Sequence, residues 1–321
     1  MSLDLNKVGR HVKNEKFCAH LKKTILELWR CKKDIYPSTV PVLLNRDDLY
    51  RFENYEYFIT SYLKEKHVQL FFFRDYYNKN IAVICDKLFN FYKVTIECVE
   101  DVYLNTLFDC QIKDIGGEYL LYLNDCVCIH GNNIKNMSFE YRLSAVETFL
   151  NTNILLADQS ILFKQKLFYK LRDVSDYIDE VTKFNLDAST GLLFVPNNLP
   201  LICGTQKSNL YWLQNNDYSI DLTVVEDQEN ANELVLECYN LKNKFKYAKV
   251  TGHNLLSKIK SLENYKPGCI TEFKIINKTL EPSMVKLDKV YPNGLRVIEM
   301  VLYTINENIT LDEIKNIKNV K

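Results

Sequence analysis

The chain has no excess of charge of either sign, because 41 basic residues balance 41 acidic ones over its 321 residues. A chain without net charge has no overall field to hold a polyanion, so any contact with RNA must be local. No run of about 18 apolar residues is present to span a bilayer. The opening residues, MSLDLNKVGRHVKNEKF, also lack the apolar stretch of a signal peptide. The sequence therefore predicts a protein of the cytoplasm or nucleus, without membrane contact.

Paired cysteine spacing is missing as well. Of ten cysteines, only Cys126 and Cys128 lie close together in the sequence. In a reducing compartment we expect most of them to be small buried apolar residues, in preference to disulfides or zinc ligands. Internal repeats, low-complexity linkers and long runs of one charge are absent too.

Hydrophobic periodicity predicts a mixed α+β chain. Apolar spacing favours helices over 15–31, 141–151 and 162–184. Aromatic and β-branched runs from 57 to 112 predict a meandering antiparallel sheet, which 119–129 continues. Further strands are expected at GLLFVP and LYWL.

The last third of the chain has a different pattern. Its short strands, ELVLECYNL, KFKYAKV, GCITEFKII and SMVKLD, suit a small barrel of the oligonucleotide-binding type. Because 321 residues exceed what one core usually covers, we expect two domains. The expected limits are 1–222 for the first domain, 223–294 for the barrel, and 295–321 for terminal helices that pack back on the first domain.

Residues 57–73 read YFITSYLKEKHVQLFFF. This segment resembles the first motif of eukaryotic and viral mRNA capping guanylyltransferases, which belong with DNA and RNA ligases to the covalent nucleotidyltransferase superfamily. In that motif a tyrosine-rich strand leads into Lys-x-Asp-Gly-x-Arg and then an apolar strand ending in aromatics. The alignment places Tyr62 at the nucleophilic lysine, and Lys64, Glu65 and His67 at the aspartate, glycine and arginine.

Other segments resemble later motifs in the family's order: IAVICDKLFNFYKV, LFDCQI, YLLYLNDCVCIHGNNI, STGLLFVPNNLPLICGTQKSNLYWLQNNDYSIDL, PGCITEF and VKLDKVYPN. The resemblance implies an adenylation-type nucleotidyltransferase domain of antiparallel sheets with helices, followed by an OB-fold barrel and terminal helices. Beyond the first motif, it assigns these positions to the nucleotide site: Lys87, Asp109, Gln111, Asp125, Arg142, Thr190, Tyr211, Leu213, Asp221, Lys286, Asp288 and Lys289.

Several reacting groups of the family are replaced. Family enzymes attack the α-phosphate of GTP with the lysine amine, with cations around the phosphates and carboxylates that carry a divalent metal. Here Tyr62 stands at the nucleophilic lysine, His67 at the arginine, Tyr211 and Leu213 at two further lysines, and Gln111 and Thr190 at carboxylates. Each charge-assisted contact to phosphate is worth about 1.5 to 3 kcal/mol, so the loss of the arginine and the two further lysines removes roughly 5 to 9 kcal/mol.

Three hypotheses follow. The leading one is a catalytically inactive or weak capping subunit that meets an RNA 5′ end and the capping machinery, meaning an active capping enzyme, an RNA triphosphatase or the polymerase II C-terminal domain. The second is a divergent active guanylyltransferase that uses GTP with Mg²⁺ or Mn²⁺ and labels Tyr62, Lys64 or Lys66. The third is a single-stranded RNA-binding module that acts through the barrel. A nuclear location is expected, or a cytoplasmic one for a virus or cytoplasmic element.

The remaining motif residues also suit plain structural roles. Asp109, Asp125 and Asp221 could accept hydrogen bonds at strand ends or turns. The charges of 286–289 suit a solvated turn. The residues alone assign no metal site.

Overall fold

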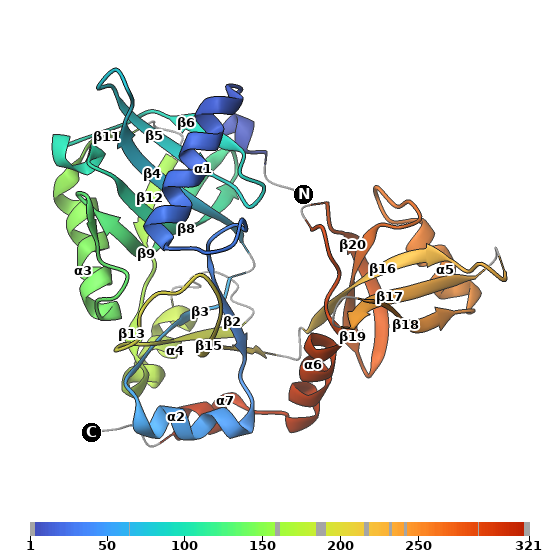
Figure 1. Cartoon of the computed structure of the whole chain (residues 1–321). Helices are drawn as coiled ribbons and strands as arrows, with labels where there is room; N and C mark the ends of the chain where they lie inside the picture. The colour runs from blue at the N-terminus through green and yellow to red at the C-terminus, as the bar shows by residue number, and fades with distance from the viewer. Residues whose placement is uncertain are drawn as a thin grey trace. The chain divides into compact units, whose positions relative to one another are not determined.

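The computed structural model describes residues 4–63, 65–157, 161–183, 191–214, 218–230, 233–240, 243–287 and 289–317. Contacts divide the chain into two units (Figure 1). The first comprises Met1–Val42, Tyr50–Tyr211 and Ile317–Lys321, and the second Leu43–Leu49 and Trp212–Asn316. The longer segment of the second unit begins at Trp212, before the expected limit of 223, and it includes the terminal helices. Whether the expected domains fold separately stays a prediction.

The first unit is built around an eight-stranded sheet of order β1-β6-β5-β4-β8-β9-β10, with β12 beside β9. All neighbours are antiparallel except β12 and β9, which are parallel. The strands are β1 Arg10–His11, β4 Lys66–Arg74, β5 Asn80–Cys85, β6 Phe91–Val94, β8 Thr106–Ile115, β9 Glu118–Ile129, β10 Asn132–Asn133 and β12 Ile161–Gln165.

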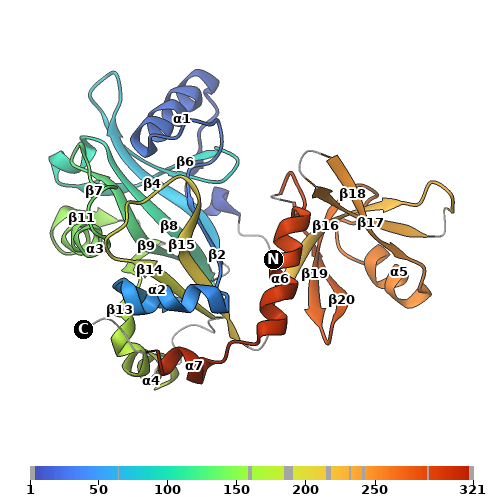
Figure 2. The same cartoon turned by 60° about the horizontal axis from the view of Figure 1, so that its bottom comes forward.

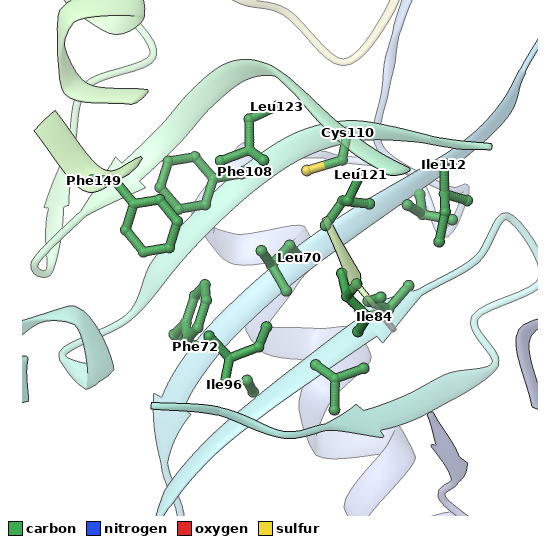
Figure 3. Packing of buried hydrophobic residues seen from close by; sticks show 14 of the residues in the cluster. Leu70, Phe72, Ile84, Ile96, Phe108, Cys110, Ile112, Leu121, Leu123 and Phe149 are labelled. Atoms are coloured by element: carbon green, nitrogen blue, oxygen red, sulfur yellow. The ribbon is translucent and has the colours of Figure 1, made fainter. Parts of the chain in front are cut away.

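The middle strand β4 is buried on both faces. Alternate side chains of a strand point to opposite faces, so Leu70 and Phe72 join one apolar cluster and Phe71 and Phe73 another. Figure 3 shows the first cluster, where the Phe108 and Phe149 ring centroids lie 4.6 Å apart. The unbroken aromatic run of β4 thus reflects burial on two sides, as the predicted sheet requires.

Helix α1 (Glu15–Trp29) covers the face of the sheet that carries Phe71 and Phe73 (Figures 1 and 2). Its buried residues Leu21, Ile25 and Trp29 recur every four positions, which places them on one face. Asn14 caps its first turn, and Arg30 ends it in the left-handed conformation. The predicted helix over 15–31 is confirmed.

A second sheet of the first unit has the order β13-β3-β14-β15-β2. Its strands are β2 Thr39–Leu43, β3 Tyr57–Ser61, β13 Tyr169–Lys170, β14 Gly191–Pro196 and β15 Gly204–Leu213. A small pair joins β7 (Ile96–Cys98) to β11 (Ile154–Ala157). The predicted strands at GLLFVP and LYWL are both present.

The predicted helix over 162–184 is wrong in its first half. Residues Ile161–Gln165 form β12, because their backbone pairs with β9, and α4 spans only Val174–Lys183. The helix expected over 141–151 is α3 (Phe139–Thr148), which continues as a π-helical turn over Phe149–Asn153. The remaining helices of this unit are α2 Leu49–Asn54 and the 3-10 turns Leu5–Lys7, Glu100–Tyr103 and Leu171–Asp173.

Cysteines mostly behave as expected. Eight carry free thiols, and seven of these are buried. Cys31 and Cys203, however, form a disulfide across 172 residues, contrary to the expected preference for free thiols. Two cysteines so far apart in the sequence give no spacing signal.

The second unit holds a five-stranded antiparallel sheet of order β18-β17-β16-β19-β20. Its strands are β16 Ser219–Glu226, β17 Leu234–Asn240, β18 Asn243–Val250, β19 Ile270–Ile276 and β20 Thr279–Val285. Its helices are α5 His253–Lys260, α6 Leu295–Glu307 and α7 Leu311–Lys315, with a 3-10 turn at Arg46–Asp48. The four expected strands are present, and closure into a barrel stays a prediction. No described helix is long and apolar enough to cross a membrane.

Candidate functional site

The first-motif turn joins β3 to β4 and carries Tyr62. Its backbone N–H donates to the carbonyl of Gly191 at 2.8 Å, which continues the pairing of β3 with β14. The Tyr62 ring stacks on the ring of Tyr211 in β15, with centroids 4.5 Å apart and planes inclined by 13°. Two positions that the resemblance assigns to lysines therefore face each other as aromatic rings.

The surroundings of Tyr62 disfavour its charged form. Burial raises the pKa of the Tyr62 phenol above its usual range, because an apolar setting penalises the phenolate. A neutral phenol is a poor nucleophile. Offset stacking of two aromatic rings contributes about 0.5 to 1.5 kcal/mol beyond their burial, so the pair stabilises the turn as it stands.

A polar group lies on β4 and β8, which follow the turn. His67 is opposite Gln111 in the strand register. The His67 Nε2 atom lies 3.0 Å from Asp109 Oδ1, and both side chains are largely buried. The edge of the Tyr36 ring packs on the His67 ring with centroids 5.8 Å apart. The structure thus brings together His67, Asp109 and Gln111, three of the residues that the sequence assigned to the site.

Lys166 is a buried cation at this site that sequence reasoning missed. Its Nζ atom donates to Gln111 Oε1 at 3.2 Å, and Gln111 Nε2 donates to the Leu63 carbonyl, in the first-motif turn, at 3.1 Å. The Lys166 side chain lies directly after β12, and the residue is 6% exposed. Reading 162–184 as a helix hid it, because a lysine on a helix would be expected at the surface.

Asp125 and Arg142 form a buried pair with each other. Arg142 Nε donates to Asp125 Oδ1 at 2.7 Å, and Nη2 donates to Oδ2 at 3.1 Å. Asp125 Oδ1 also accepts the backbone N–H of Cys126 at 2.8 Å. The carboxylate and the guanidinium therefore neutralise one another between β9 and α3, in keeping with a structural role.

Lys87 lies on the exposed turn between β5 and β6, in which Asp86 accepts the backbone N–H groups of Leu88 and Asn90 at 2.9 Å each. The polar group of His67, Asp109 and Gln111 is formed without Lys87.

Some sequence candidates cannot be placed at the site. Lys64, Thr190 and Asp288 lie outside the described residues. Lys66 begins β4, and alternation along the strand puts it on the same face as Val68, which is in the core, and opposite to His67. Its backbone position therefore directs it away from the polar group.

The family of the chain follows from a comparison of its sequence with protein-family models. Residues 6–215 match the model described as mRNA capping enzyme, catalytic domain, which is more than half of the chain. This chain belongs to the mRNA capping enzyme family. The turn at Tyr62 and the polar group on β4 and β8 both lie inside the matched region.

Solved structures that this capping-family chain resembles include DNA ligases. For mycobacterial DNA ligase D complexed with ATP and MES, the TM-score is 0.42 and the identity 8%, over 79% of this chain and 95% of that one. For Chlorella virus DNA ligase-adenylate the values are 0.37 and 7%, over 80% and 100%. A Lig E DNA ligase gives 0.39 and 11%, over 78% and 100%. The family assignment rests on the matched residues 6–215.

The later motifs of the capping enzyme family fall in the second unit. Asp221 on β16 is opposite Glu272 on β19 in the strand register. Lys289 forms an ion pair with Asp221, and Lys286 forms one with Glu272. Leu213 at the end of β15 is buried. These lysines are thus held by carboxylates within the unit, and the expected group of Asp221, Lys286 and Lys289 is brought together.

The described residues of the site do not fit a GTP–metal complex of the family type. Over the described ranges, no group of three or more acidic, histidine or cysteine side chains could hold a metal ion. Gln111 is occupied by Lys166 and the Leu63 carbonyl where the family has a carboxylate. A neutral amide is a weaker ligand for Mg²⁺ than a carboxylate.

Proposed function

We propose that this member of the mRNA capping enzyme family is a noncatalytic subunit that contributes to cap formation by binding. The observation that carries the proposal is the stack of Tyr62 on Tyr211 at 4.5 Å. The family uses amines at both positions, one to attack and one to neutralise phosphate. Here a tyrosine ring replaces each amine, and the two rings stack on each other.

The pattern of replacement supports the same proposal. Positions that shape strands, such as Phe71, Phe72 and Phe194, stay apolar and fully buried. Positions that react have become aromatic, amide or aliphatic. Retention of the residues that form the fold, together with loss of the charged catalytic residues, is the pattern typical of a pseudoenzyme. We propose as partners the RNA 5′ end and an active capping enzyme, an RNA triphosphatase or the polymerase II C-terminal domain, and we propose a nuclear location.

The test is covalent labelling with GTP that carries a labelled α-phosphate. The purified chain is incubated with Mg²⁺ or Mn²⁺ and separated by denaturing electrophoresis beside an active enzyme of the family. We expect a labelled band for the active enzyme and none for this chain. A band that withstands heat and detergent would overturn the proposal.

A divergent active transferase is the second candidate, because Lys166 places a buried amine against Gln111 at the site. Removal of a lysine amine from solvent is one way in which such a nucleophile is activated. If a band forms, the adduct is mapped by mass spectrometry. Loss of label in Lys166→Arg, with label kept in Lys64→Arg, Lys66→Arg and Tyr62→Phe, would assign the reaction to Lys166.

A further inference from the structure

A groove in the first unit lies apart from the polar group and the first-motif turn. It has a volume of about 930 Å³ and is lined by residues 10–20 on one side and by the β4–β5 turn, β5 and β6 on the other. Ligand clefts have volumes of about 300 to 1,000 Å³. None of the candidate-site residues that the structure describes lines this groove.

The groove is rich in unpaired positive charge. Arg10, Lys13, Lys16 and Lys93 all line it and are exposed. In the described part of the chain none of the four makes an ion pair. Arg10 and Lys93 are opposite each other in the pairing of β1 with β6, so two cations sit side by side. Although the chain has no net charge, four cationic side chains gather along this groove.

Among the described residues that line the groove, the single acidic side chain is already engaged. Asp75 Oδ1 accepts the backbone N–H groups of Tyr77 and Lys79 at 2.9 Å each, which closes the β4–β5 turn. The Asp75 carboxylate therefore stabilises the turn, and its single negative charge balances only one of the four positive charges.

Two tyrosines at this turn expose their rings to solvent. Tyr76 is 80% exposed and Tyr77 is 84% exposed. Tyr76 also reaches across to α1, where its hydroxyl lies 3.3 Å from His20 Nδ1. Neighbouring exposed rings beside a row of cations are the combination that single-stranded nucleic acids bind, with bases on the rings and phosphates on the cations.

We infer that this groove binds a single-stranded nucleic acid, and the choice of RNA rests on the proposed function in cap formation. Its cations are distributed over β1, the start of α1 and β6, which suits a chain of phosphates better than a single one. A duplex would keep its base faces stacked and could not use the tyrosines. An acidic peptide would match the charge but would leave the two rings without stacking partners.

The experiment measures binding of a fluorescent 12-nucleotide oligouridylate to the full chain by anisotropy, from 50 to 200 mM salt. For four phosphate contacts on a single strand, the slope of log K against log salt should be about −2.8. The variant Arg10→Gln/Lys13→Gln/Lys16→Gln/Lys93→Gln should bind at least about tenfold more weakly, with most of that slope lost. Its matched control changes four exposed lysines outside the groove: Lys7, Lys32, Lys33 and Lys164.

A second pair of variants tests the rings. Tyr76→Ala/Tyr77→Ala should weaken binding by about fivefold or more for each base that loses its stacking partner. The control Tyr55→Ala/Tyr141→Ala removes two surface rings outside the groove, which are 55% and 54% exposed. Equal affinity of the groove variant and its control would overturn the inference.

Crosslinking of the unmodified chain gives an answer that no folding defect can affect. A 4-thiouridine oligonucleotide should crosslink to peptides that contain Tyr76 and Tyr77. Crosslinks confined to 219–285 would overturn the inference in favour of the second-unit sheet. Tighter binding of poly-glutamate or of oligodeoxythymidylate than of oligouridylate would overturn the choice of RNA.

Discussion

Asp125 and Arg142 illustrate how a charged pair can serve the fold instead of a ligand. Their side chains are 7% and 2% exposed and make two parallel hydrogen bonds. Removing one partner of a buried pair leaves the other charge without compensation, at a cost of about 3 to 5 kcal/mol. We therefore expect Arg142→Met to lower the free energy of unfolding by about that amount in urea titrations.

The control for this change is Lys23→Ala. Lys23 lies 3.9 Å from Glu27 on the exposed side of α1, and such pairs contribute at most about 0.5 kcal/mol. Equal effects of the two substitutions would contradict a structural role for Arg142.

The sequence allowed part of the site to be predicted. The resemblance to the capping family assigned His67, Asp109 and Gln111 to one site, and the structure brings them together because each lies on β4 or β8 and the two strands pair. Lys166 could not be foreseen, because its contact with Gln111 joins residues 55 positions apart through backbone pairing that no local pattern encodes. The resemblance placed Tyr62 and Tyr211 at one site, but it did not predict that their rings stack.

Among the elements, β4 contributes side chains to both apolar clusters of the first unit. Phe72 is fully buried, with ring centroids 5.4 Å from Phe149 and 5.9 Å from Tyr103. Replacing a buried phenylalanine with alanine costs about 3 to 5 kcal/mol, because the packing contacts are lost and a cavity remains. We expect Phe72→Ala to destabilise the first unit by this amount in urea titrations.

Tyr141→Ala is the comparison, since Tyr141 is 54% exposed on α3. A surface change of this kind should alter stability by no more than about 0.5 kcal/mol. A similar loss in both variants would contradict the assignment of Phe72 to the core.

Elements with a clear period were predictable, and those that depend on a distant partner were not. The helix α1 follows from the spacing of Leu21, Ile25 and Trp29. The strand β12 does not follow from its own residues, ILFKQ, because their spacing also suits a helix and only pairing with β9 decides the matter. The groove likewise joins residues 10–20 to 75–93, a proximity that becomes visible only in the fold.

For the whole molecule, carboxylates with lowered pKa values make stability depend on pH. Hydrogen bonding to Lys249 holds the pKa of Asp227 below its usual range. The pKa of Glu313 is also lowered, first by a hydrogen bond from the backbone N–H of Thr310 and then by one from the Arg46 side chain. A carboxyl whose pKa is lower in the folded state adds stability that is present above its unfolded pKa, near 4, and is lost as the pH falls through the folded value.

We therefore expect the melting temperature to be steady from pH 7 to pH 5 and to fall steadily below about pH 4.5. Asp227→Asn should reduce the acid-dependent part of that fall, measured by thermal scans at each pH. Glu263→Gln, at an exposed position of the second unit, is the control. An unchanged pH profile in Asp227→Asn would contradict the contribution of Asp227.

The interleaved course of the chain also affects how the molecule is made. Leu43–Leu49 belong to the second unit, yet they leave the ribosome well before its other part, which begins at Trp212. At 5 to 20 residues per second, that interval lasts roughly 10 to 30 seconds. Leu44 is fully buried in the finished protein. During that interval its nascent segment is exposed to solvent or bound by a chaperone. The second unit is therefore completed only near the end of synthesis, even though its segment Leu43–Leu49 is translated early.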